Sequence, residues 1–269
     1  MSTTTAFIGG GQMAQALIAG ILEAGILSPH SILVAEPDHA RRQFLADTYG
    51  VDCRPSATMV VPESARIVIA VKPQIITSVL SEVKEHLQDQ PIISIAAGIS
   101  LDFIAGCIDN YQHPIIRVMP NTPALVAKGA SALCCNESVS EEQYAQVRAL
   151  FDAVGVTTLV DESAMNGITA VSGSGPAYLF SFVEALIDGG VKIGLPRDTA
   201  RTMAIQTVLG AAEMLARTDE HPALLRDRVC SPGGTTICAQ HALERGSFHS
   251  VVMDAVEASW RRAEELANR

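Results

Sequence analysis

Three consecutive glycines stand between a short apolar segment and a helix-like segment at the start of the chain, and they constrain the fold most. Residues 5–8 (Thr-Ala-Phe-Ile) have the pattern of a buried strand, and residues 13–22 repeat apolar side chains at helical spacing before Gly25. Between them, residues 9–14 fit the pattern G-x-G-x-x-A. The first glycine permits a tight turn, Gly11 lets the backbone approach a pyrophosphate, and Ala14 lets the helix pack closely on the strand. We therefore predict a dinucleotide-binding site.

An acidic residue at the end of the second predicted strand bears on the choice of dinucleotide. Glu36 lies 22 residues after Ala14 and directly follows the apolar segment 32–35. A carboxylate at this place binds the adenosine ribose hydroxyls and favours NAD, because it repels the 2′-phosphate of NADP. Arg41 and Arg42 follow one helical turn later, where they could pair with that phosphate or form a solvated helix face. The sequence leaves both cofactors open, NADPH and NADH.

The first 161 residues alternate strand-like and helix-like segments. Continuous apolar runs occur at residues 67–71, 92–95 and 115–118, and a polar helix is predicted at residues 38–49, before Gly50. Such runs are typical of strands that are buried on both faces of a parallel sheet. Alternation of these strands with helices predicts a doubly wound α/β sheet, and so an N-terminal Rossmann domain over residues 1–161.

The strand signal disappears after Asp161. Apolar side chains recur at helical spacing over residues 178–187, a further helix is expected to begin at Pro196, and a closing helix is expected over residues 247–266. We therefore predict an all-α domain over residues 162–269. Its apolar faces are broad for so small a unit, which indicates burial against a second copy of the chain.

Two loops follow predicted strands at the carboxyl edge of the sheet, where ligands bind in such folds. Residues 70–73 (Ala-Val-Lys-Pro) end one strand, and residues 119–124 (Met-Pro-Asn-Thr-Pro-Ala) end another. Two prolines fix the shape of the second loop, and Asn121 offers both a donor and an acceptor. Each loop is open to two interpretations, a rigid turn or a ligand contact.

Two glycine-containing segments precede predicted helices in the second half. Residues 172–177 (Ser-Gly-Ser-Gly-Pro-Ala) combine a serine cap with a proline in the first turn, which predicts the start of a long helix. Residues 231–236 (Ser-Pro-Gly-Gly-Thr-Thr) place two glycines before two threonine hydroxyls at a helix start. Glycines let backbone amides converge, so this segment suits a carboxylate, and a capped turn is the alternative.

Composition and cysteine usage argue against several classes of function. The 269 residues include 19 basic and 29 acidic side chains, a net charge of −10, so a basic face for nucleic acid is not expected. No uninterrupted apolar run approaches the ~20 residues of a membrane helix, and residues 1–5 lack the basic start of a signal peptide. The six cysteines and seven histidines show no paired metal-binding spacing. We expect a cytoplasmic protein with reduced thiols and no metal, nucleic acid or membrane partner.

In their order along the chain, these segments resemble the pyrroline-5-carboxylate reductase family. Residues 229–236 (Val-Cys-Ser-Pro-Gly-Gly-Thr-Thr), with Leu225 before them and residues 243–244 (Leu-Glu) after them, look like that family's signature. The other matching segments are the glycine loop and residues 70–73, 119–124 and 172–178. The resemblance implies reduction of 1-pyrroline-5-carboxylate to L-proline with NAD(P)H, the last step of proline biosynthesis. It also implies a helical domain that interleaves with its partner in a homodimer, often within a larger ring.

The motifs and the resemblance together predict the residues of the site. The predicted cofactor-binding residues are Ile8, Gly9, Gly10, Gly11, Gln12, Met13, Glu36, Ala70, Val71, Lys72, Pro73 and Asn121. The predicted substrate-binding residues are Glu162, Ser231, Gly233, Gly234, Thr235 and Thr236, with Thr236 as the catalytic residue. By resemblance, residues 9–13 bind the pyrophosphate, and residues 70–73 line the ribose and nicotinamide. Two positions depart from the family: Glu36 replaces a small polar residue of NADPH-preferring members, and Ala57 replaces an asparagine that contacts the cofactor in some members.

The chemistry of a cyclic imine sets what the protein must supply. The imine carbon is already electrophilic, more so when the nitrogen is protonated, so the protein mainly aligns the nicotinamide with it and excludes water. Two other functions stay open. A dehydrogenase of similar architecture acting on a hydroxy acid typically needs a catalytic lysine or histidine, and none stands out in the helical half. A non-catalytic NAD(P)-binding regulator has no need of the segment 231–236.

Overall fold

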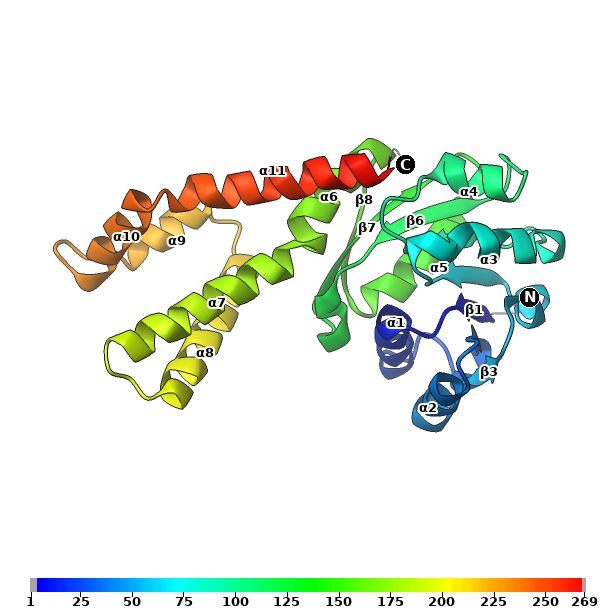
Figure 1. Cartoon of the computed structure of the whole chain (residues 1–269), viewed down its shortest axis with the longest axis horizontal. Helices are drawn as coiled ribbons and strands as arrows, with labels where there is room; N and C mark the ends of the chain where they lie inside the picture. Colours follow the sequence, from blue (N-terminus) through cyan, green and yellow to red (C-terminus); the bar gives the residue numbers. More distant parts are fainter. Residues whose placement is uncertain (1–3, 268–269) are drawn as a thin grey trace. The chain divides into compact units, whose positions relative to one another are not determined.

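The computed structural model describes residues 4–267, and a sheet of eight strands forms its largest element (Figure 1). The strands are β1 (Thr5–Ile8), β2 (Ile32–Ala35), β3 (Asp52–Arg54), β4 (Arg66–Ile69), β5 (Ile92–Ser94), β6 (Ile115–Met119), β7 (Gly129–Cys135) and β8 (Gly155–Leu159). Their order in the sheet is β3-β2-β1-β4-β5-β6-β7-β8. Strands β1 to β6 are parallel, β7 pairs antiparallel with β6, and β8 pairs parallel with β7. The predicted doubly wound Rossmann sheet is confirmed, with two further strands at one edge.

Helices cover both faces of this sheet. They are α1 (Gln12–Glu23), α2 (His39–Tyr49), α3 (Ile76–Val83), α4 (Leu101–Cys107), α5 (Glu141–Asp152) and α6 (Met165–Ile168). The polar helix predicted at residues 38–49 is confirmed as α2. Asp38 caps it by accepting the backbone N–H of Arg41 at 2.7 Å, and Gly50 ends it in the left-handed region with φ of +68°.

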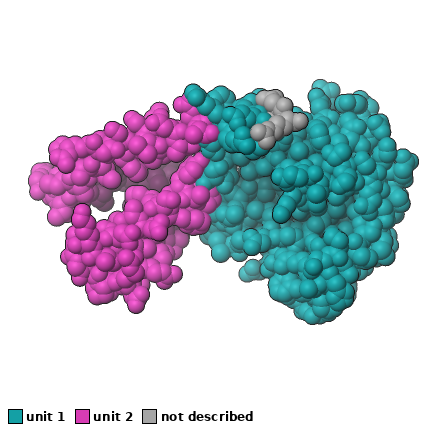
Figure 2. Space-filling model, viewed as in Figure 1, with its two compact units in different colours: residues 1–174, 259–269 teal, residues 175–258 magenta. Residues whose placement is uncertain are grey.

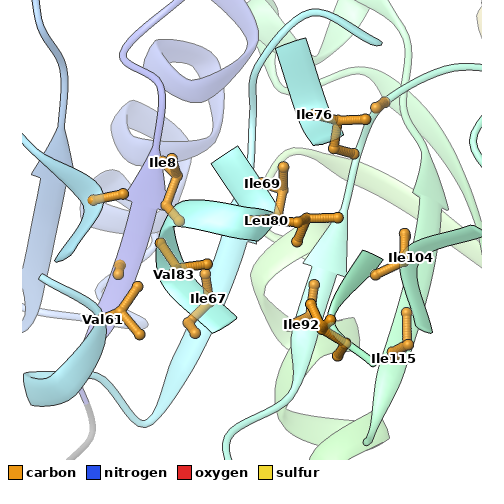
Figure 3. Close-up of a cluster of buried hydrophobic side chains, with 14 of the residues drawn as sticks. Ile8, Val61, Ile67, Ile69, Ile76, Leu80, Val83, Ile92, Ile104 and Ile115 are labelled. Carbon is orange, nitrogen blue, oxygen red and sulfur yellow. The ribbon is translucent and has the colours of Figure 1, made fainter. Parts of the chain in front are cut away.

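An apolar cluster on each face holds the helices to the sheet. On one face, α3 and α4 pack against side chains from β1, β4, β5 and β6, as Figure 3 shows. The labelled side chains are Ile8, Val61, Ile67, Ile69, Ile76, Leu80, Val83, Ile92, Ile104 and Ile115. On the other face, Phe7 and Val68 pack with Leu17 of α1 and Phe151 of α5. Full burial of each large apolar side chain contributes about 1.5–3 kcal/mol, so the carboxyl edge of the sheet is a rigid platform.

Three strands were not predicted from the sequence, each for a physical reason. Strand β3 has only three residues, two of them charged, and lies at the edge of the sheet. Strand β7 is made mostly of small residues and cysteines, which have no strong strand preference. Strand β8 lies at the other edge and is only partly covered, so it lacks a continuous apolar run.

The long helix predicted to begin within residues 172–177 is confirmed as α7, which begins at Gly175. One helical stretch extends from Glu162 to Lys192, through α6, a π-helical turn (Thr169–Gly173) and α7 (Gly175–Lys192). By length and composition alone it could also cross a membrane, so the expectation of no membrane partner stays a prediction. Its first part belongs to the core of the sheet, since the side chain of Met165 is fully buried there.

The chain divides into two compact units (Figure 2). Unit 1 contains the sheet, the described residues up to Ser174 and those from Ser259 on, and unit 2 contains residues 175–258. The helices of the second half are α7, α8 (Arg197–Arg217), α9 (Pro222–Arg228), α10 (Thr235–Arg245) and α11 (Phe248–Ala267). The helices expected after Pro196 and over residues 247–266 are therefore present. The unit boundary differs from the predicted domain boundary at residue 162, because residues 162–174 pack with the sheet.

Unit 2 has almost no interior in a single chain. Of residues 175–258, all of which the structure describes, only Ala200 and Ala204 are buried. Large apolar side chains are exposed instead, including Phe180 at 67% and Met253 at 71%. A hollow of about 1030 Å³ between α7, α10 and α11 is lined largely by apolar residues such as Leu186. An isolated copy of unit 2 therefore leaves its hydrophobic surface in water.

Candidate nucleotide- and substrate-binding site

The glycine loop joins β1 to α1 at the carboxyl edge of the sheet. Gly9 has φ of +100°, and a Cβ atom there would lie 2.7 Å from the carbonyl oxygen of Ala70. Its N–H donates to the carbonyl of Ala35 at 2.8 Å, and the carbonyl of Ile8 accepts the N–H of Ala70 at 2.8 Å. The loop is thus fixed between the ends of β2 and β4, and the predicted tight turn at Gly9 is confirmed.

The N-terminus of α1 is open toward a ligand. Gly11 is its N-cap residue, no side chain caps it, and its first turn contains no acidic residue. A Cβ atom at Gly11 would meet no described atom within 4 Å, whereas Ala14 is 1% exposed against the sheet. The amide N–H groups of Gln12 and Met13 lack acceptors within the helix because they lie in its first turn. This geometry fits the pyrophosphate of a dinucleotide.

Charged side chains of opposite sign hold Gly10 from two sides. The Glu36 carboxylate accepts the N–H of Gly10 at 2.9 Å and the N–H of Asp38 at 3.0 Å. Arg41 donates from Nε to the carbonyl of Gly10 and from Nη2 to Gln15 Oε1. The predicted ribose-binding carboxylate and the alternative phosphate-binding guanidinium therefore lie at the same loop.

Arg42 is held differently from Arg41. Its Nη1 donates to the carbonyls of Glu36 and Pro37, each at 2.7 Å. The guanidinium therefore fixes the turn that follows β2.

The two strand-end loops differ in how exposed their predicted ligand groups are. Lys72 is exposed after β4, and Pro73 begins a short turn that leads into α3. Asn121 is only 8% exposed. Its Oδ1 accepts the N–H of Ala130 at 2.9 Å, and its Nδ2 donates to the carbonyl of Ser172 at 3.0 Å. Both ends of this amide serve the backbone, which agrees with the rigid-turn interpretation, and its cofactor contact stays a prediction.

Glu162, predicted to contact the substrate, forms an ion pair with a buried arginine. Its Oε1 lies 3.1 Å from Nη1 of Arg117 and accepts the N–H of Leu101 at 2.8 Å. The Arg117 side chain is 7% exposed, and Glu162 is its counter-charge. Burial raises the pKa of the neighbouring Cys134 thiol to about 12, with the Glu162 charge as a further cause.

Arg117 was missed in the sequence, although one signal was present. It is the only charged residue in the apolar run of β6. A charge within a buried strand requires a partner, so the position of Arg117 was the one signal that could have pointed to an acidic partner.

In unit 2, residues 231–236 form a tight loop before α10. Gly233 has φ of +66°, and the N–H of Gly234 donates to the carbonyl of Ser231 at 3.0 Å. A Cβ atom at Gly234 would overlap the Ser231 hydroxyl. Helix α10 begins at Thr235 with no side-chain cap and no acidic residue in its first turn. The amides of Thr235 and Thr236 are therefore available to a carboxylate, and the predicted helix start is confirmed.

Among residues 4–267, no three His, Cys, Asp or Glu side chains lie together in a way that could hold a metal ion. The polar groups described above are backbone amides, hydroxyls and paired charges. The chemistry they offer is anion binding and hydrogen bonding.

Comparison with known proteins relates both halves of the chain to reductases. A family model described as pyrroline-5-carboxylate reductase dimerisation matches residues 162–266, and one described as NADP oxidoreductase coenzyme F420-dependent matches residues 4–98. A pyrroline-5-carboxylate reductase of Synechocystis is 44% identical over the full length of both chains. One of Arabidopsis thaliana is 43% identical over 97% of this chain and 94% of its own.

Solved structures give the same result. A pyrroline-5-carboxylate reductase of Coxiella burnetii aligns with a TM-score of 0.94 at 35% identity, covering 99% of each chain. A pyrroline carboxylate reductase of Plasmodium falciparum with NADP bound aligns with a TM-score of 0.89 at 34% identity, covering 98% of each chain.

Proposed function

Because this chain belongs to the pyrroline-5-carboxylate reductase family, we propose how its residues divide the reduction of 1-pyrroline-5-carboxylate to L-proline. The protein is an oxidoreductase that uses NAD(P)H. The loop of residues 231–236 carries the proposal, since its two glycines expose amides at an uncapped helix start within the family's dimerisation region. Unit 1 holds the cofactor, and unit 2 holds the substrate.

The glycine loop binds the cofactor pyrophosphate. The N–H groups at the start of α1 donate to it, and no acidic side chain in that turn opposes it. Residues 70–73 and the loop after β6 line the nicotinamide and its ribose, and Glu36 faces the adenosine ribose. NAD(P)H supplies the hydride when bound.

The substrate is held through its carboxylate and its ring nitrogen. The amides of Thr235 and Thr236, with the Ser231 hydroxyl, bind the carboxylate at the start of α10. The Thr236 hydroxyl hydrogen-bonds the ring nitrogen. As the imine carbon gains the hydride, the C=N double bond becomes a single bond and the nitrogen keeps the proton it carried as iminium. No further acid is required. Glu162, also proposed to contact the substrate, is held by its ion pair with Arg117.

The exposed apolar helices of unit 2 support a homodimer. A second copy covers the faces of α7 and α8 that one chain leaves in water, and dimers assemble further into a ring. Burial against a partner also explains why the helical stretch 162–192 is apolar, with no need for a membrane. The six cysteines are all unpaired, which supports a reducing, cytoplasmic location. The net charge of −10 supports the expectation of no nucleic-acid partner.

The test is cofactor oxidation by the purified protein with different substrates. We expect oxidation of NADH or NADPH that depends on pyrroline-5-carboxylate and yields proline. Oxidation with a 2-keto acid instead would indicate the hydroxy-acid dehydrogenase. Cofactor binding without turnover of either substrate would indicate the non-catalytic regulator.

A further inference from the structure

We propose that Asn121 is a positioning residue for the hydride transfer, which acts by holding the π-helical turn where the chain leaves unit 1. This inference rests on the proposed function. It gives Asn121 a different role from the cofactor contact predicted from sequence, and it concerns contacts within unit 1 and along the helix that leaves it.

The starting observation is a proline just after a π-helical turn. Pro176 lies in the first turn of α7, and the π-helical turn Thr169–Gly173 and a bend at Ser174 come directly before it. In an α-helix the carbonyl of Ser172 would accept the N–H of residue 176, and proline has none. Ser172 is partly buried, and a carbonyl with reduced access to water is costly to leave without a donor. The helix therefore needs a donor from elsewhere.

Asn121 supplies that donor. Its Nδ2 lies 3.0 Å from the carbonyl oxygen of Ser172, and its Oδ1 accepts the N–H of Ala130. The side chain is nine-tenths buried, so water does not readily replace it. One amide thus joins the loop after β6, the start of β7 and the π-helical turn.

Packing around the turn fits the same role. A Cβ atom at Gly173 would lie 2.7 Å from Cε of Met119, so the turn lies directly against the last residue of β6. The hydroxyls of Ser174 and Ser259 lie 2.9 Å apart. These two serines are the last residue of unit 1 before the chain leaves it and the first after the chain returns. Both connections to unit 2 are therefore tied together beside Asn121.

Loss of the Asn121 hydrogen bonds should affect catalysis more than cofactor binding. The loop after β6 is proposed to line the nicotinamide, and the helix from the turn leads into the unit with the substrate loop. Hydride transfer tolerates little misplacement of the reacting atoms. A loosened turn should therefore slow the chemical step while the pyrophosphate site at Gly9 to Met13 stays intact.

The test uses three variants, Asn121→Ala, Pro176→Ala and the double variant. Pro176→Ala restores an N–H four residues after Ser172, so it supplies the missing donor by another route. We expect Asn121→Ala to lower kcat/KM for pyrroline-5-carboxylate about 5- to 100-fold, mainly through kcat. The Kd for the dinucleotide should change less than about threefold. The double variant should recover most of the loss, and Pro176→Ala alone should be close to wild type.

Amide hydrogen exchange of residues 169–178 in the cofactor-free protein gives a readout that needs no turnover. Exchange should accelerate in Asn121→Ala and slow again in the double variant. If Asn121→Ala does not fold, Asn121→Asp keeps an oxygen that accepts the Ala130 N–H and replaces the donor to Ser172 by a carboxylate oxygen, and exchange of residues 169–178 should again be faster than in the wild type.

Three results would overturn the proposal. They are a wild-type kcat/KM in Asn121→Ala, a dinucleotide Kd weakened tenfold or more without rescue by Pro176→Ala, and unchanged hydrogen exchange. A wild-type protein that does not reduce pyrroline-5-carboxylate would instead refute the proposed function, and the exchange data would still decide whether Asn121 holds the turn.

Discussion

Replacing Glu36 by serine is expected to shift cofactor preference toward NADPH. The carboxylate is partly exposed and fixed by the N–H groups of Gly10 and Asp38, at 2.9 and 3.0 Å. Its charge therefore stays at the ribose end of the proposed site, where NADPH would add a negative 2′-phosphate. Two unit charges 4 Å apart repel by about 1 kcal/mol in water and about 4 kcal/mol at an effective dielectric constant of about 20. A partly exposed site is closer to water, so we expect about 1–1.5 kcal/mol.

This free energy corresponds to roughly a 5- to 12-fold change in the ratio of kcat/KM for NADPH to that for NADH. Steady-state kinetics with both cofactors measure it. Glu36→Gln is the matched control, because it keeps an oxygen that accepts the Gly10 N–H and removes only the charge. Both variants should shift the ratio in the same direction. If the wild type already strongly prefers NADPH and neither variant changes the ratio, Arg41 and Arg42 set the preference and the reasoning is wrong.

Three further predictions concern other parts of the molecule. Thr236→Ala should lower kcat/KM for pyrroline-5-carboxylate about 10- to 1000-fold, by the loss of one preorganised hydrogen-bond partner of the ring nitrogen. Dinucleotide binding, measured by fluorescence titration, should not change, and Thr236→Ser should retain most activity. A near-wild-type kcat/KM in Thr236→Ala would make the hydroxyl only part of a helix start. Leu209 is an exposed apolar residue of α8, and Leu209→Glu should reduce the mass measured by light scattering from at least two chains to one. Tyr111 is exposed outside the dimerisation region, and Tyr111→Glu should leave the mass unchanged. Burial lowers the pKa of His113 below its ordinary 6.5, so its imidazole stays neutral in the folded state while it gains a proton in the unfolded state. The free energy of unfolding, measured by urea titration, should therefore fall as the pH drops below about 6.5. His113→Gln should flatten this dependence.

The parts predicted correctly from sequence are those that local patterns determine. The apolar run before Gly9, the periodic helix after it and the caps of α2 depend on near neighbours in the chain, so β1, α1 and α2 appear where expected. The glycines at 233 and 234 likewise signal a tight loop before α10, because residue 233 has φ of +66° and a Cβ atom at 234 would overlap the Ser231 hydroxyl.

The parts missed depend on contacts between distant residues. The start of α7 within residues 172–177 is visible in the sequence, but the hydrogen bond from Asn121 Nδ2 to the Ser172 carbonyl joins residues 51 positions apart and leaves no local signal. Glu162 could not be paired with Arg117 from sequence, since the two lie 45 residues apart. Strand β7 forms by pairing with β6 and β8 and shows little pattern of its own.

The most direct test of the proposed function follows the hydride itself. The purified protein is incubated with pyrroline-5-carboxylate and NADPH carrying two deuterium atoms at the nicotinamide C4, and the proline formed is analysed by mass spectrometry and NMR. Direct hydride transfer to the imine predicts L-proline with one deuterium, at the former imine carbon, in a one-to-one ratio to oxidised cofactor. Proline without deuterium, or cofactor oxidation without proline, would contradict the assignment.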